Sequence, residues 1–220
     1  MKTNTIIDYL DKMIPNVYCP LKYNKDYELL IAVLLSAQCT DERVNKVTPF
    51  LFNKYDIFQL ALASEKEIED IIRPCGNQVK KSKYIVEIAK RLVEDYEGKV
   101  PNNREYLESL PGIGRKSTNV VLNNIFNVPA FAVDTHVSRV AKRLGISKSE
   151  DVRKIEEDLM KKFPEDKWGR LHHQFLLFGR YICKSQNPNC KDCLFSKICT
   201  YYKNTNKWFV FFLLGVYDTI

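Results

Sequence analysis

The sequence has few of the patterns that mark strands, membrane spans or linkers. Period-two alternation of apolar and polar residues is nearly absent, which argues against a sheet-based fold. No stretch approaches the roughly 20 apolar residues that span a bilayer. Asp8, Asp11 and Lys12 interrupt the apolar residues near the N-terminus, so a signal peptide is not expected. We therefore expect a cytoplasmic chain without repeats or low-complexity linkers.

Acidic residues are outnumbered by basic ones. The 220 residues include 34 Lys and Arg against 27 Asp and Glu, for a formal net charge of +7. This balance favours a polyanionic partner, with nucleic acid ahead of a membrane surface. A length of 220 residues allows one large or two small domains with their own hydrophobic cores.

Apolar residues recur at helical spacing through most of the chain, which predicts an all-α fold of about ten helices. Residues 27–37 are apolar nearly all round and should form a buried central helix. Ser64 and Glu67 have the spacing of a capping box, and Gly98 should end a helix over residues 81–96. Ser149 should begin another helix, closed by Pro164. Pro49 should kink or split a helix over residues 41–55.

The most informative segment is LPGIGRK at residues 110–116, between two helical patterns. Asn102 or Asn103 can cap the helix before it, Pro111 and Gly112 should stop that helix, and Gly114 should permit a left-handed turn. Two glycines at this spacing expose backbone N–H groups, which with the next helix N-terminus suit a phosphate. A plain helix-to-helix turn is the alternative.

Lys116 lies in the first turn of the helix that follows. The positive end of a helix disfavours an ammonium group there, and we expect burial to do the same. A neutral lysine amine is a nucleophile that forms Schiff bases. The alternative is an ordinary solvated lysine.

Asp134 precedes the helical pattern Val137, Val140, Ala141 and Leu144 and is well placed as a helix N-cap. A carboxylate there can also stabilise a developing sugar cation and move a proton. The same residue can do both.

Four of the seven cysteines fall within a short segment with the spacing C-x6-C-x2-C-x5-C. Such spacing is a strong metal signal, because cytoplasmic thiols stay reduced and do not form disulfides. The spacing alone fits a structural zinc or a 4Fe–4S cluster. The four residues are Cys183, Cys190, Cys193 and Cys199.

Several segments together resemble the helix-hairpin-helix superfamily of base-excision DNA glycosylases and AP lyases. They are residues 34–46 (LLSAQCTDERVNK), 110–123 (LPGIGRKSTNVVLN) and 132–140 (AVDTHVSRV), together with the cysteine spacing. The similarity extends over roughly residues 1–203. It implies two helical domains flanking a DNA-binding cleft: a six-helix barrel with the hairpin at 18–128, and an iron–sulfur domain of 1–17 plus 129–203. Residues 204–220, including the apolar run 208–217, form a tail of unassigned role.

The resemblance implies a 4Fe–4S cluster instead of zinc. It also implies Lys116 as the attacking amine and Asp134 as the catalytic carboxylate, acting on oxidised, ring-saturated or fragmented pyrimidines and abasic sites in duplex DNA. The protein would act as a monomer, and it would be associated with the nucleoid if the source is bacterial. Gln38 matches a residue that fills the vacated base stack; alternatively it is a buried amide ending a helix. The expected DNA contacts are Gln38, Gly112, Ile113, Gly114, Arg115, Lys184 and Lys191.

Two places depart from the family pattern. Relatives commonly have a bulky apolar wedge directly after the glycine equivalent to Gly76, whereas this chain has Asn77, so Val79 or Gln38 would take that role. The loop 183–190 carries only Lys184, so we expect weaker phosphate contact from it.

Three alternative functions follow from the same motifs. A mismatch glycosylase for adenine or thymine is disfavoured, because such relatives usually lack the lysine or replace it with tyrosine. A non-catalytic DNA-binding or redox module is separated from an enzyme only by Lys116 and Asp134. A zinc-bound relative is the third.

Overall fold

The computed structural model of the chain describes residues 2–205. Within this range the regular structure is entirely helical, as the sequence predicted, and no strand occurs. None of the described helices is long and apolar enough to cross a membrane. The predicted apolar tail over residues 208–217 lies outside the described residues.

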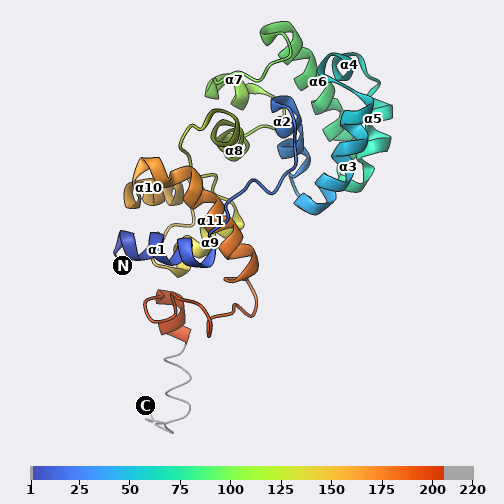
Figure 1. Cartoon of the computed structure of the whole chain (residues 1–220). Coiled ribbons are helices and arrows are strands. Elements are labelled where there is room, and N and C mark those ends of the chain that lie inside the picture. The colour runs from blue at the N-terminus through green and yellow to red at the C-terminus, as the bar shows by residue number, and fades with distance from the viewer. Residues whose placement is uncertain (1, 206–220) are drawn as a thin grey trace. The chain divides into compact units, whose positions relative to one another are not determined.

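The chain divides into two compact units (Figure 1). One unit contains residues 19–128, and the other joins the N-terminal segment up to Tyr18 with the chain from Pro129 onward. The helices of the first unit are α2 (Asp26–Leu35), α3 (Asp41–Lys54), α4 (Ile57–Leu62), α5 (Glu65–Ile72), the 3-10 turn η1 (Arg73–Cys75), α6 (Gln78–Tyr96), α7 (Arg104–Ser109) and α8 (Arg115–Phe126). Those of the second are α1 (Thr3–Met13), α9 (Thr135–Arg143), α10 (Val152–Lys162), the 3-10 turn η2 (Glu165–Lys167) and α11 (Trp168–Tyr181).

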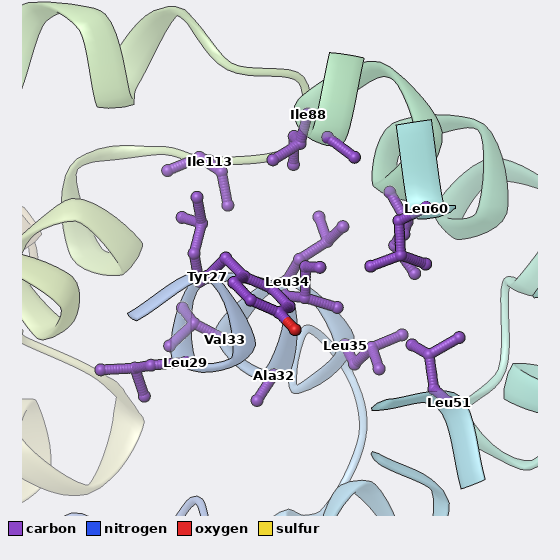
Figure 2. Packing of buried hydrophobic residues seen from close by; sticks show 14 of the residues in the cluster. Tyr27, Leu29, Ala32, Val33, Leu34, Leu35, Leu51, Leu60, Ile88 and Ile113 are labelled. Atoms are coloured by element: carbon purple, nitrogen blue, oxygen red, sulfur yellow. The ribbon is translucent and has the colours of Figure 1, made fainter. Parts of the chain in front are cut away.

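Helix α2 is the centre of the first unit, as its apolar sequence predicted. Every residue of α2 except Asp26 is buried. Figure 2 shows its side chains packed among Leu51 of α3, Leu60 of α4, Ile88 of α6 and Ile113 of the turn before α8. Burying a Leu or Ile side chain contributes roughly 1.5–3 kcal/mol, so this packing fixes where both ends of α2 lie.

The second unit is built around α11, in which all residues from Leu171 to Gly179 are buried. Phe131, Phe163 and Phe175 pack against one another with ring centroids 5.8–6.2 Å apart. The buried Gln174 ties α11 to α1, because its amide nitrogen donates to Asp11 Oδ1 at 2.8 Å.

Several local predictions hold and others are wrong. Gly98 ends α6 as predicted, with its N–H bonded to Leu92 O. Ser64 precedes α5 but forms no side-chain cap, and the Glu67 carboxylate accepts a hydrogen bond from Tyr55. The capping box is formed instead by Asp56 and Gln59 at the start of α4.

Two helix boundaries also differ from the prediction. Helix α10 begins after Asp151, whose side chain accepts from Lys154 N, and not at Ser149. Helix α3 runs unbroken through Pro49, so the predicted split is wrong. A single proline removes one helical bond, and the buried residues Val44, Val47 and Leu51 hold both halves of α3 in place.

Candidate functional site

The turn between α7 and α8 has the hairpin form that the glycines predicted, with one correction. Asn103 caps α7 through a 3.0 Å bond from Tyr106 N. The left-handed residue is Gly112, at φ +78°, and not Gly114, which has φ −105°. The N–H of the buried Ile113 bonds to Leu110 O at 3.1 Å and closes the turn.

The two glycines serve different purposes. A Cβ atom on Gly112 would lie 2.6 Å from a Leu34 methyl and 2.7 Å from the Tyr84 ring. Both its conformation and its packing therefore require glycine. A Cβ on Gly114 would meet nothing within 4 Å, so the protein's own packing does not require glycine there.

Gly114 is the N-cap of α8 and has no side chain to bond the first amides of that helix. The first N–H groups of a helix lack intrahelical partners and carry partial positive charge. An anion approaching Gly114 would meet these groups with no Cβ in the way. The turn 112–114 thus has the geometry of a phosphate site.

Lys116 is the second residue of α8 and is exposed. The expected burial of its amine is wrong, because this first turn lies at the surface of its unit. Within that unit Lys116 forms no ion pair with a carboxylate. Its amine therefore remains available to a substrate.

Asp134 is the N-cap of α9, as predicted. Its Oδ1 accepts hydrogen bonds from His136 N at 2.9 Å and Val137 N at 2.8 Å. Both bonds end on Oδ1, so the cap leaves Oδ2 for another role. The side chain is half-buried and fixed in direction by the helix it caps.

Gln38 lies in the turn between α2 and α3 and is exposed, so the interpretation as a buried amide is wrong. Its φ is +55°, a left-handed conformation that non-glycine residues seldom adopt. The turn before α6 is also left-handed, with Gly76 at φ +69° and Asn77 at φ +50°, and Val79, the second residue of α6, is 52% exposed. We call residues 37–39 and 75–79 the two insertion turns.

The four clustered cysteines line one cavity, together with apolar residues such as Phe178 and Phe195. Burial, together with charge on Cys183, Cys199 and Cys190, raises the pKa of Cys193 to about 11. Four thiolates can therefore share this cavity only with cations among them.

Within the described part of the chain, no three Cys, His, Asp or Glu side chains are arranged to hold a single metal ion. A 4Fe–4S cluster takes its four thiolates on four different irons, so the sulfur atoms need not converge on one point. The donor set and the shared cavity fit that cluster.

Two arginines of α9 hold the loop that carries Cys183, and the sequence interpretation missed this role. Arg143 donates to Lys184 O at 2.6 Å and to Cys183 Sγ at 3.4 Å, and it stacks on the Tyr201 ring at 4.2 Å. Arg139 donates to Cys183 O at 3.1 Å. Their spacing of four residues on α9 was the available signal.

The side chains of Lys184 and Lys191 are exposed at the edge of the cysteine segment. The backbone of Lys184 is held by Arg143, which fixes the loop while leaving the lysine side chain outside. Both lysines thus stay candidates for contact with phosphate.

With this geometry established, comparisons with known proteins define the class. Residues 31–165 match the model of the HhH-GPD superfamily base excision DNA repair proteins. The chain belongs to this family. Its fold and its hairpin are those of a helical base-excision DNA glycosylase.

Individual relatives narrow the class. Endonuclease III of Bacillus subtilis is 45% identical over 195 residues, which cover 88% of this chain and 89% of that one. A solved structure of a trapped covalent endonuclease III–DNA intermediate is 43% identical with a TM-score of 0.87, covering 93% of this chain and 99% of that one. A thermostable thymine-DNA glycosylase is more distant, at 25% identity and a TM-score of 0.80, covering 92% and 95%. The chain is accordingly a DNA glycosylase and AP lyase of base excision repair, similar to endonuclease III.

Proposed function

We propose that the protein removes oxidised, ring-saturated or fragmented pyrimidines, such as thymine glycol, from duplex DNA and then cuts the strand 3′ to the site. The observation that carries this proposal is the exposed Lys116 amine, two residues after the glycine that opens α8. A phosphate bound at the turn 112–114 would bring the deoxyribose of a neighbouring nucleotide to that amine. The trapped covalent DNA complex of the endonuclease III relative supports the same chemistry.

The proposed reaction begins with attack of the Lys116 amine nitrogen on the anomeric carbon of the damaged nucleotide. The glycosidic bond breaks, its electron pair leaves with the base, and the base takes up one of the protons that the amine loses. The amine loses its protons as the sugar ring opens, which gives an imine, and we assign this proton transfer to Asp134. Removal of a 2′ proton then expels the 3′ phosphate by β-elimination, and hydrolysis of the imine frees the lysine.

Access to the base requires that the nucleotide leave the stack. A damaged base pairs and stacks poorly, so its extrusion costs less than that of a normal base. We propose that Gln38 enters the vacated space, and that Val79 acts as the wedge that relatives place directly after the glycine equivalent to Gly76. Gly112, Gly114 and Arg115 would contact phosphate, and Lys184 and Lys191 would add weaker contact. The buried Ile113, whose N–H is bonded to Leu110 O, would hold the turn in shape.

We propose that Cys183, Cys190, Cys193 and Cys199 hold a 4Fe–4S cluster with a mainly structural role. When bound, the cluster supplies the cations that allow four thiolates to share one cavity. Arg139 and Arg143 would keep the first of these cysteines in place. We also propose that the protein acts as a monomer in the cytoplasm, where the chromosomal DNA of a bacterium is found.

The proposal is tested by incubating the protein with a duplex that contains one thymine glycol and then adding borohydride. Borohydride reduces an imine and fixes a lysine–sugar adduct as a permanent cross-link. We expect an adduct with the wild type and with Lys83→Ala, a matched exposed lysine on α6, and none with Lys116→Ala. Base release without an adduct would indicate a glycosylase that does not use Lys116. DNA binding without release of any pyrimidine lesion would leave a binding module.

A further inference from the structure

We infer that Lys81 is a positioning residue that holds the two insertion turns in one arrangement, so that both enter the DNA together. Lys81 lies in the fourth position of α6 and is 4% exposed. The inference rests on the proposed function, because it concerns how the damaged base is expelled. All the residues involved belong to the unit of residues 19–128.

The ammonium group of Lys81 donates three hydrogen bonds, all to backbone carbonyls. Its Nζ lies 2.9 Å from Leu35 O, 2.8 Å from Ala37 O and 3.0 Å from Cys75 O. A lysine ammonium has three N–H donors, so every donor is used. One nitrogen atom thus joins the end of α2 and its following turn to the end of η1.

Two of these carbonyls belong to the peptide units directly before left-handed residues. Ala37 O precedes Gln38, at φ +55°, and Cys75 O precedes Gly76, at φ +69°. A hydrogen bond to a carbonyl fixes the plane of its peptide unit, and therefore the direction in which the next residue leaves. Lys81 sets that direction for both insertion turns at once.

The turns are also neighbours through their cysteines. The thiol of Cys75 interacts with that of Cys39; Cys39 comes directly after Gln38, and Cys75 comes directly before Gly76. Burial raises the pKa of Cys75 to about 11, so its thiol stays protonated at neutral pH. Lys81 is then the buried charged group at this junction.

Burying an ammonium group costs free energy, even when carbonyl groups accept its hydrogen bonds. Burial lowers the pKa of Lys81, which means that the fold opposes the charge there. Removing the Lys81 ammonium would leave the carbonyls of Leu35, Ala37 and Cys75 without this donor, so Lys81 also contributes to stability. Its distinctive property is that three bonds from one atom hold two turns at a fixed separation.

The test compares Lys81→Met with Lys83→Met, which alters an exposed lysine of the same helix. We expect single-turnover release of thymine glycol from a duplex to fall at least about tenfold in Lys81→Met, since small misplacement of reacting groups costs up to 10²-fold. Cutting of a duplex with a preformed abasic site, which has no base to expel, should change less than about threefold. Lys83→Met should match the wild type on both substrates.

A spectroscopic measurement separates positioning from general damage. We would place 2-aminopurine opposite an uncleavable tetrahydrofuran abasic site and add enough protein to saturate binding, as measured by anisotropy. Entry of Gln38 unstacks the opposite base and raises its fluorescence. We expect that rise with the wild type and Lys83→Met, and its loss with Lys81→Met at equal occupancy.

Wild-type levels of thymine glycol release and fluorescence in Lys81→Met would overturn the inference, as would a parallel fall on both substrates. If Lys81→Met does not fold, Lys81→Arg takes its place, because it keeps the charge but cannot donate three bonds from one atom. It should show a smaller deficit confined to thymine glycol release, and no deficit would overturn the inference. Failure of the proposed function is distinct, because the wild type itself would then release no base.

Discussion

Removing the Asp134 carboxylate separates its role as the N-cap of α9 from its proposed role in catalysis. Asp134→Ala removes the acceptor of the 2.9 Å and 2.8 Å bonds from His136 N and Val137 N. Loss of an N-cap costs about 1 kcal/mol, within a range of roughly 0.5–2 kcal/mol. For a chain of this size that corresponds to about 2–4 °C in melting temperature. Asp134→Asn retains an oxygen acceptor and loses only the attraction of the charge for the helix N-terminus, about 0.3–1 kcal/mol.

Activity should follow a different order from stability. If Asp134 moves a proton and stabilises the sugar cation, both variants lose about 10²-fold or more in the rate of base removal. The stability of Asp134→Asn should nevertheless stay closer to the wild type than that of Asp134→Ala. The assay pairs thermal unfolding, followed by circular dichroism, with single-turnover release of thymine glycol.

Asp151 provides the matched control, because its Oδ1 caps α10 with a 2.8 Å bond from Lys154 N and has no proposed chemistry. Asp151→Ala should lose a similar amount of stability and keep the wild-type rate. Equal destabilisation of Asp134→Asn and Asp134→Ala would refute the argument from the cap. A wild-type rate in Asp134→Asn would leave Asp134 as a cap alone.

Four further changes test other parts of the structure. Burial lowers the pKa of His173, so the folded state binds fewer protons than the unfolded state, and the stability should fall as the pH drops through about 6.5. In urea unfolding, His173→Leu should make the stability depend less on pH. An unchanged dependence would refute the assignment to His173. Gly112→Ala should cost about 1–3 kcal/mol, because its methyl would overlap Leu34 and Tyr84, as measured by the unfolding midpoint. Gly114→Ala should cost less than about 1 kcal/mol but weaken binding to an abasic-site duplex, so equal affinity would argue against the phosphate site. Cys190→Ser should lose iron and visible absorbance while Cys19→Ser keeps both, and retention in Cys190→Ser would exclude Cys190 as a ligand.

The local features of the fold were readable from the sequence. The helical class, the apolar α2, the cap at Asn103 and the stop at Gly98 depend on interactions within a few residues. Local competition already defeats some of these signals. Glu67 has the spacing of a capping box from Ser64, yet its carboxylate accepts a hydrogen bond from Tyr55, twelve residues earlier in the chain.

The sequence was sufficient to identify which residues form the site, but not what surrounds each of them in the fold. The hairpin glycines, Lys116, Asp134 and the four cysteines are recognisable because chemistry restricts which residue types can act. The sequence could not show which glycine adopts the left-handed conformation, because Gly112 is constrained by Leu34 and Tyr84, which approach it from distant parts of the chain. The exposure of Lys116 likewise depends on what the rest of its unit covers.

Lys81 shows most clearly what only the tertiary structure decided. Tyr84 and Ile85 follow Lys81 by three and four residues on α6, a spacing typical of one buried helix face. That spacing could have indicated a buried lysine, but not its partners. Two of them, Leu35 and Ala37, lie 46 and 44 residues away. The sequence determined the helices and the chemistry they carry, while long-range packing decided which carbonyl groups meet the ammonium, because burial is a property of the whole unit.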